Sequence, residues 1–343
     1  MQSIGIVRRC WLLAVGLALL VGAASAADRP LIVCPTGAKN KECAFFGGTG
    51  IQEAVDRATD GSTVLLKPGI YSPQRYRDTR YKRFIIRGFV TIHRKNLRLI
   101  GEPGAILDGA GGPAVSALVI EGGNVGVSSL TLRNFHAVEP MDDLFDGSGM
   151  HIIDASAVLS DITFERYAKM AVNARGSALV TATRLRMQDG FVAVMMAESA
   201  HMRLCNSIIR RHAAAGVASY ANSTLSIYNS VVDSNGDDGL YAVANAEIFA
   251  TNSLILRNKP YAVRVNDNAR VWVGHSVVFG NESNIFSPAG KQLVTFGPGV
   301  LESDPKADSN YALPSILAGD PDVRDLSGEK SRIGLGEAAG CGP

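Results

Sequence analysis

The strongest constraint on the fold is a regular repeat that runs through the second half of the sequence. Apolar and polar residues each recur with a period of about 23, in columns that keep their register over several repeats. These columns are Leu179, Met202, Leu225, Ile248 and Val271; Leu185, Ile208, Val231, Leu254 and Val277; Val194, Val217, Leu240 and Val263; Asn206, Asn229 and Asn252; and His212, Asn235, Asn258 and Asn281. Such a period predicts stacked units, each too small to bury its own apolar face.

Inside one repeat the apolar residues alternate with others, as in a strand. Leu225 and Ile227 are two apart, Val231 follows a polar pair, and Ser234 to Gly239 is rich in turn formers. The repeat therefore predicts coils of short parallel strands, with equivalent residues stacked at about 4.8 Å. Asn206, Asn229 and Asn252 are then interpreted as side-chain amides stacked in a turn, because Asn both donates and accepts hydrogen bonds.

Residues 1–26 are typical of a secretory signal peptide. Arg8 and Arg9 precede an apolar run from Trp11 to Val21, and Ala24-Ser25-Ala26 resembles a cleavage site. The run is short for a membrane span, and no later stretch reaches that length. We therefore expect an exported chain, periplasmic or extracellular, with no membrane span after cleavage.

Composition excludes two classes of protein. The whole chain has 34 Lys plus Arg and 32 Asp plus Glu, so loss of Arg8 and Arg9 leaves 34 − 2 = 32 basic residues and near neutrality. A nucleic-acid-binding protein needs a basic excess, so no nucleic-acid partner is expected. With 46% apolar and 19% charged residues, the chain is not intrinsically disordered.

Four cysteines follow the signal sequence. Cys34 and Cys43 bracket a short polar segment, which favours a local disulfide in an exported chain. A metal site is the weaker interpretation, because no second Cys or His pair has ligand spacing. Whether Cys205 pairs with Cys341 is left open by the sequence.

The chain resembles the pectin-lyase-like superfamily of right-handed parallel β-helices. The resemblance rests on the repeat, on the opening segments Asp60-Gly61-Ser62-Thr63-Val64 and Pro68-Gly69-Ile70-Tyr71, and on Gly319-Asp320-Pro321-Asp322 near the end. It implies an all-β fold, a single-stranded right-handed parallel β-helix with a capping helix (Ile51, Val55 and Ala58 on one face). The domain is expected at 27–343, with the cap at 44–60, the coils at 61–296 and a tail at 297–343.

The superfamily contains lyases, esterases, polygalacturonases and epimerases, and most of these classes have a characteristic motif that this sequence either carries or lacks. Pro73 stands where the esterases have Glu, and the epimerase Asp-Pro-His-Asp element is absent. Gly236-Asp237-Asp238-Gly239 resembles the paired-Asp motif of the polygalacturonases, but the partner motifs are missing. A lyase is harder to exclude, because its site needs only a cation to neutralise a uronate carboxylate and a nearby base.

The repeat register gathers charged residues on the turn that follows each main strand, and this ridge is the predicted site. Arg211 or Lys169 would neutralise the carboxylate, with His212 or Tyr167 as acid or base. The expected substrate-binding residues are Asp189, Asp233, Asp237, Asp238, Arg257 and Lys259. The competing interpretation is a solvated turn ridge, because charged turn residues are usually exposed.

Two further features carry weaker expectations. The acidic loop 142–146 would hold Ca²⁺ or overhang a groove, although it lacks calcium-loop spacing and is more typical of a surface loop. Phe249 and Trp272, in one column with Arg203 and Ser226, should point outward on adjacent coils. They would stack on sugar rings, or be covered by the tail from Leu293 onward.

The sequence thus leaves three hypotheses in order. The first is binding or processing of an acidic, uronate-containing polysaccharide, with lyase chemistry ahead of hydrolase or epimerase chemistry, no required cofactor and Ca²⁺ as an option. The second is a non-catalytic structural or adhesive β-helix. The third is a periplasmic metal-handling accessory protein, disfavoured because His, Met and Cys do not cluster.

Overall fold

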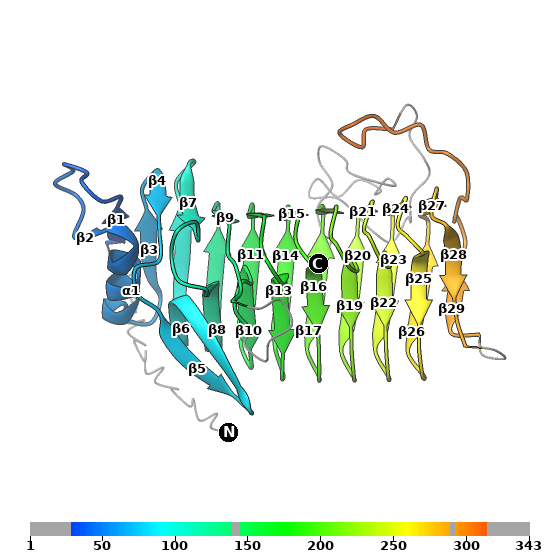
Figure 1. Ribbon diagram of the computed structural model, residues 1–343, viewed down its shortest axis with the longest axis horizontal. Coiled ribbons are helices and arrows are strands. Elements are labelled where there is room, and N and C mark those ends of the chain that lie inside the picture. The colour runs from blue at the N-terminus through cyan, green and yellow to red at the C-terminus, as the bar shows by residue number, and fades with distance from the viewer. Residues whose placement is uncertain (1–28, 139–144, 289–291, 314–343) are drawn as a thin grey trace, which may run out of the picture.

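The computed structural model describes residues 29–138, 145–288 and 292–313. The predicted signal peptide at residues 1–26, most of the acidic loop and Cys341 lie outside these ranges. The described part is an elongated stack of parallel coils with one helix at its N-terminal end (Figure 1). This confirms the predicted right-handed parallel β-helix.

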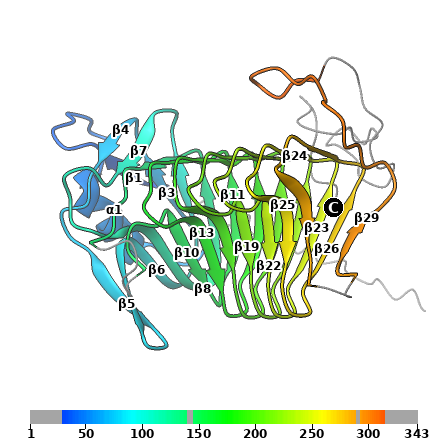
Figure 2. The same cartoon turned by 45° about the vertical axis from the view of Figure 1, so that its right-hand side comes forward.

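Each regular coil contributes three short strands. Two belong to a large sheet, sheet A, and the third belongs to a nine-stranded sheet, sheet B. In sheet A the long strands β6 (Phe84–Gly101) and β8 (Ser116–Ser128) run through both halves, which we call the first and second ladders. Figure 2 shows the coils edge-on, with the ladders and sheet B enclosing a common interior.

The strands fall into these groups. The first ladder continues from β6 and β8 through β10 (Met150–Ile153), β13 (Met170–Arg175), β16 (Val192–Met196), β19 (Val217–Ser219), β22 (Leu240–Ala242), β25 (Tyr261–Val265) and β28 (Ser283–Phe286). The second ladder contains β1 (Leu31–Cys34), β2 (Phe45–Phe46), β3 (Ser62–Leu66), β6, β8, β11 (Ser156–Ser160), β14 (Leu179–Thr183), β17 (His201–Cys205), β20 (Thr224–Tyr228), β23 (Glu247–Thr251), β26 (Arg270–Gly274) and β29 (Val294–Phe296). Sheet B contains β4 (Gly69–Tyr71), β7 (Ala105–Asp108), β9 (Thr131–Arg133), β12 (Thr163–Glu165), β15 (Arg186–Gln188), β18 (Ile208–Arg210), β21 (Val231–Asp233), β24 (Leu254–Leu256) and β27 (Val277–Phe279).

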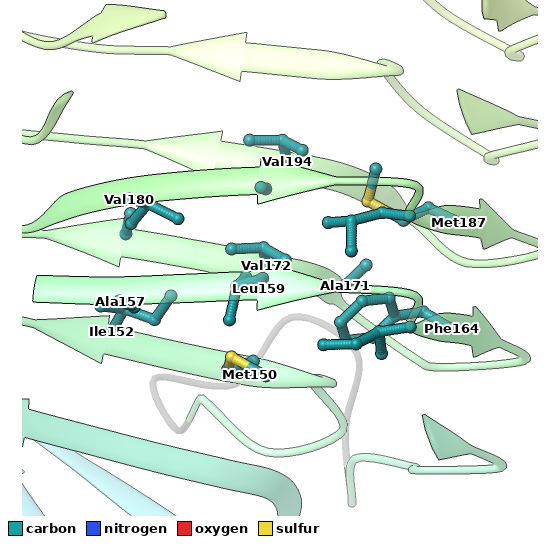
Figure 3. Close-up of a cluster of buried hydrophobic side chains, with 14 of the residues drawn as sticks. Met150, Ile152, Ala157, Leu159, Phe164, Ala171, Val172, Val180, Met187 and Val194 are labelled. Carbon is teal, nitrogen blue, oxygen red and sulfur yellow. The ribbon is translucent and has the colours of Figure 1, made fainter. Parts of the chain in front are cut away.

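From Met202 onward the repeat columns of the sequence are the register of the sheets. Leu179 was wrongly placed, because it pairs with His201, and Arg186 rather than Leu185 pairs with Ile208. Leu225 pairs with Ile248, Val217 with Leu240, and Val231 with Leu254, each one repeat apart. Inward side chains stack into one continuous core, part of which Figure 3 shows between β10 and β16. Truncating such a side chain to Ala typically costs about 2–5 kcal/mol, because the neighbouring coils cannot close the space.

Helix α1 (Gly47–Arg57) covers the N-terminal end of the core. Ile51 and Val55 are buried against the first coil, as the sequence predicted, and Ala58 is buried just beyond the helix. The Cys34–Cys43 disulfide beside it confirms the favoured pairing. Among the described residues no helix is long and apolar enough to span a membrane.

Two turn columns hold successive coils together. Asn206, Asn229, Asn252 and His275 all take left-handed backbone angles, with φ of 45° to 52°, which Asn tolerates better than most residues. The serines that follow them form a cross-coil ladder, in which each backbone N–H donates to the next Oγ at 3.1 or 3.2 Å. A ladder of side-chain amides lies in the next turn, through Asn235, Asn258 and Asn281.

An antiparallel hairpin interrupts the parallel coils, and the sequence analysis did not predict it. Strand β5 (Arg77–Tyr81) pairs with the start of β6, and the hairpin runs obliquely to the coil strands in Figure 1. At its tip, the Tyr81 hydroxyl donates to Glu198 Oε2 at 2.5 Å and Lys82 Nζ donates to Glu198 Oε1 at 2.8 Å. The hairpin therefore spans several coils along the outward side of the first ladder.

Candidate functional site

The predicted ridge is a set of coil-to-coil ion pairs. Arg211 Nε donates to Asp189 Oδ1 at 2.8 Å, and Arg257 Nη2 donates to Asp233 Oδ2 at 2.7 Å. The Tyr311 hydroxyl from the tail also donates to Asp233 Oδ2, at 2.6 Å. Each of these charges therefore already has a partner on the adjacent coil or the tail.

Two of the four proposed catalytic residues are not on an exposed surface. Tyr167 and His212 are 4% and 2% exposed, and they hydrogen-bond to each other inside the cylinder. His212 Nδ1 also lies 2.9 Å from Asn235 Oδ1, so this histidine begins the amide ladder. Burial lowers the pKa of His212 to about 4, which keeps the ring neutral at physiological pH. The expectation that these side chains face a polymer is therefore wrong.

The remaining ridge residues are divided between solvent and interior. Lys259 is exposed, whereas Lys169 is only 7% exposed. Asp237 and Asp238 are set apart from the ridge, because they begin the first-ladder segment of their coil. Of the predicted binding residues, these two lie beside Arg264 on the outward side of the first ladder.

Outward side chains of the first ladder form a second, different constellation, which we call the first-ladder face. One of its columns is fixed by the strand register and combines His, Arg and aromatic residues. It runs through His151, Asn173, Met195, Ala218, Tyr241, Arg264 and Phe286. Ala218 on β19 and Ala215 just before this strand are small, and larger side chains from β16 and β22 pack together with them.

At the C-terminal end of this face, Arg264 lies among three rings. Its Cζ is 5.7, 5.0 and 5.7 Å from the ring centres of Tyr241, Tyr261 and Phe286. Arg264 Nε is 3.2 Å from Asp238 Oδ2, and Nη2 is 3.8 Å from Asp237. Cation–π contacts and the two carboxylates together fix the guanidinium.

Asp238 beneath this arginine is fully buried. Among the described residues neither of its oxygens accepts a hydrogen bond with good geometry. Burial raises the pKa of Asp238 to about 7, and the adjacent Asp237 adds to the rise while Arg264 opposes it. Asp238 therefore changes its charge near neutral pH without touching solvent.

At the other end, Arg175 is a half-buried cation. Its Cζ lies 4.8 Å from the ring centre of Phe145, its Nε donates to Asn173 Oδ1 at 3.1 Å, and Met195 Sδ is 3.7 Å from Nη2. No carboxylate lies within ion-pair distance of Arg175 in the described part of the chain. Burial lowers the pKa of Arg175, which remains charged.

Arg175 is held by a buried polar network. Asn173 Nδ2 lies 3.1 Å from His151 Nδ1, and His151 Nε2 lies 2.9 Å from the Phe145 carbonyl. Ser116 Oγ donates to the same carbonyl at 2.6 Å. Burial lowers the pKa of His151 to about 3, so the ring is neutral, with Nε2 donating and Nδ1 accepting.

Tyr220 lies between the two arginines. Its ring centre is 5.9 Å from that of Tyr241 in an edge-to-face arrangement. Burial raises the pKa of Tyr220, with Tyr241 and Asp237 adding to the rise and Arg175 opposing it. The hydroxyl is therefore protonated at physiological pH. A face with two guanidinium groups and protonated phenols can bind carboxylates and sugar hydroxyls.

The sequence contained a signal for these residues. Ala218, Tyr241 and Arg264 immediately follow Val217, Leu240 and Val263, a column that the repeat identified as inward. In a strand the next residue points to the opposite face, so this column was outward. Tyr241 and Arg264 lie in this column and Arg175 ends β13, so the strand alternation indicated all three, whereas Tyr220 follows β19 and no repeat column contains it.

The remaining expectations have mixed outcomes. In the described residues no group of three or more His, Cys, Asp or Glu is arranged to hold a metal ion. Of the acidic loop, only Phe145 and Asp146 are described, and Asp146 is paired with Arg87. Phe249 and Trp272 do lie side by side and point outward.

Within the described residues the tail covers this aromatic pair only in part, because Gly297 packs against the Trp272 ring while Phe249 stays exposed. Phe249 is 39% exposed, and β29 continues the coil, with Thr295 opposite Trp272. Tyr311 instead packs on the outer side of sheet B, with Ile208, Val231, Leu254, Leu256 and Val277.

Comparisons with known proteins agree with this architecture. The family model described as "Right handed beta helix region" matches residues 114–298. No curated protein matches the chain significantly.

Among solved structures, the pectate lyase Pel9A superimposes with a TM-score of 0.60 at 11% identity over 90% of both chains. A polygalacturonate lyase fused with a self-assembling amphipathic peptide gives a TM-score of 0.49 at 9% identity, over 89% of this chain and 88% of that one. A Bacillus subtilis pectate lyase mutant gives 0.45 at 10% identity, over 90% and 92%. At 11% identity the likeness to the pectate lyase Pel9A establishes the fold alone.

Proposed function

Because this chain belongs to the right-handed β-helix family, whose coils present long rows of outward side chains, we propose that it binds an acidic polysaccharide along its first-ladder face. The ligand is a uronate-containing polymer, and β-elimination is the reaction we assign to the site. The protein acts after export, in the periplasm or outside the cell.

Arg175 is the observation that carries this proposal. A half-buried guanidinium loses much of its hydration, and here no carboxylate within 4 Å replaces it in the described residues. Arg175 is stacked on Phe145 and hydrogen-bonded to Asn173, so its position is fixed before a ligand arrives. A uronate carboxylate has the geometry to accept two hydrogen bonds from its free donors.

The neighbouring groups suit elimination as well as binding. Elimination transfers the proton beside the carboxylate to a base, here from solvent, and breaks the bond to the leaving oxygen, which then takes up a proton. A cation on the carboxylate stabilises the charge that develops there. Tyr220, kept protonated by burial and lying near Arg175, is our proton donor. Arg264 at the far end would hold a second sugar of the same polymer.

The test compares two arginines that differ in their partners. Purified protein is mixed with a panel of uronate polymers, with and without Ca²⁺, and binding and ultraviolet absorbance are measured. An unsaturated sugar produced by elimination absorbs. We expect Arg175→Gln to weaken binding at least about tenfold, equivalent to about 1.4 kcal/mol, and to abolish the absorbance change. The matched control Arg211→Gln, on the ion-paired ridge, should change neither.

The outcomes separate the hypotheses. Binding that depends on Arg175 without any absorbance change would support a non-catalytic carbohydrate-binding β-helix. Equal behaviour of the Arg175 and Arg211 variants would remove the first-ladder face from the proposal. Loss of absorbance in Tyr220→Phe, with binding retained, would support its role as proton donor.

A further inference from the structure

A second elongated surface lies on the outward side of the second ladder, and we call it the second-ladder face. Two neighbouring cavities of about 540 and 420 Å³ lie on it, and Val158 lines both. The first extends from Gly61 across β6 and β8 to β11, and the second from β11 to β20. Together they follow the coil axis, so they match an extended chain better than a small molecule.

Small outward residues create these cavities. Gly126 on β8 has no side chain, and the stem of Arg98 from β6 lies over it, 3.3 Å from where a Cβ would stand. Beyond Gly126, the aliphatic side chains of Val158 and Leu179 are 54% and 53% exposed. Large exposed aliphatic groups flanked by Asn, Ser and Thr are suited to the apolar faces and hydroxyls of sugar rings.

The charged residues that line the two cavities have one sign. None of the residues that line the two cavities is Asp or Glu, whereas Arg98, His201 and Arg203 are present. Arg98 and Arg203 form no ion pair with any described residue, and Arg203 stacks on Tyr228 at 5.1 Å. Four coil steps separate the two arginines in one column, or about 19 Å at strand spacing. Unpaired cations at this spacing attract a polymer with repeated negative charges.

The same column continues into the aromatic pair. After Arg203 come Ser226, Phe249 and Trp272 on successive coils. Trp272 lies against Gly274 and Gly297, where a Cβ at either glycine would clash with its ring. The indole therefore packs close to the backbone of its own strand and of the next coil. Aromatic rings beside a cationic column add stacking sites for sugar rings.

We propose that the second-ladder face is a second, non-catalytic binding surface for an acidic polysaccharide, separate from the first-ladder face. Arg98 and Arg203 bind its carboxylates, Val158 and Leu179 contact the rings, and Phe249 and Trp272 extend the track. The inference shares its ligand class with the proposed function but uses different residues. A chain held here keeps the polymer on the protein when the first-ladder face is empty, which raises the effective concentration at that face.

The experiment measures binding of fluorescently labelled polygalacturonate and alginate by anisotropy at low salt. Four proteins are compared: wild type, Arg175→Gln, the double variant Arg98→Gln/Arg203→Gln, and the triple combination. We expect Arg175→Gln to bind at least about tenfold more weakly than wild type but still measurably, and the triple combination to bind at least about tenfold more weakly again. Val158→Asp, a change at an exposed position, should weaken binding in the same way, whereas Val158→Lys should not. Arg184→Gln, whose arginine is paired with Asp161, is the matched control.

Each outcome decides between the two surfaces. If Arg175→Gln alone removes all binding, the second surface is overturned and the proposed function stands. If the double variant removes all binding and Arg175→Gln removes none, the second surface stands and the proposed function falls. Unchanged binding in the double variant and in Val158→Asp overturns the inference. It is also overturned if these variants instead dissociate a dimer in sedimentation, which would make the face a contact between copies of this chain.

Discussion

The turn ridge and the first-ladder face both carry charged residues in repeat register, but they use them differently. On the ridge, Asp161 pairs with Arg184, Asp189 with Arg211, and Asp233 with Arg257, each across one coil. On the first-ladder face, Arg175 and Arg264 lie against aromatic rings, and Arg175 has no ion-pair partner among the described residues.

Charged residues pair differently in the two regions because turn residues and outward strand residues have different neighbours on the adjacent coils. A turn residue lies one coil spacing from its equivalent, so opposite charges one repeat apart meet and neutralise each other. An outward strand residue also has neighbours on both adjacent strands, and bulky rings there exclude water from the cation. Arg264 still meets Asp238 at 3.2 Å, whereas Glu198 acts on Arg175 only from beyond ion-pair distance. Opposite charges one repeat apart therefore indicate contacts that hold neighbouring coils together. A charge that lies among aromatic rings without an ion-pair partner is the better indicator of a binding surface.

The largest expected change in the free energy of unfolding comes from a substitution in the buried amide ladder behind the ridge. Asn235→Ala removes the acceptor of the His212 backbone N–H and the donor to Asn258 Oδ1, at 3.1 and 2.8 Å. Two buried groups lose a partner, so we expect a loss of about 2–4 kcal/mol in urea unfolding. The exposed amide pair supplies the control, since Asn222→Ala should cost less than about 0.5 kcal/mol. Equal losses would show that this inner ladder contributes no more than a surface contact.

A substitution on the first-ladder face is expected to raise the free energy of unfolding, by an intermediate amount. The pKa of Asp238 is raised to about 7, so folding favours its protonated form. Stability from this group is fully present below the usual carboxyl pKa and is lost as pH rises through about 7. Asp238→Asn should therefore stabilise the protein by about 1–3 kcal/mol at pH 8. At pH 4 it should have little effect. A difference in urea midpoint that does not change with pH would contradict this assignment.

The smallest effect is expected on the exposed ridge. Arg211→Ala breaks a pair whose side chains are 47% and 35% exposed, so a loss of at most about 0.5 kcal/mol is expected. The hydrogen bond from Arg211 lowers the pKa of Asp189. The contribution of the pair is therefore present at neutral pH and is lost as pH falls through this lowered pKa. It should also shrink in high salt, and a loss above about 1 kcal/mol would show that the ridge carries more than surface pairing.

Much of the fold followed from residue order alone. Leu225, Ile248 and Val271 predicted the core columns, because a parallel coil returns to the same position once in every repeat. Ile51 and Val55 predicted the capping helix, and the Cys34–Cys43 spacing predicted the disulfide. The β5–β6 hairpin was not predicted, since an insertion of this kind has no place in the repeat and its tip depends on Glu198, far along the chain.

The sequence by itself determined the period and the strand alternation, and with them the inward columns of sheet A. The apolar column through Val231 and Leu254 faces outward on sheet B, where Tyr311 packs on it. It did not determine where charges meet. His212 and Tyr167, two repeats apart, are buried together because their coils stack, and Asp189 finds Arg211 for the same reason. Arg175 comes to lie between Phe145 and Tyr220 only when separate coils and a loop close around it. Burial and partner choice depend on contacts across coils, so the tertiary structure alone decided which charged residues hold the coils together and which remain available to a ligand.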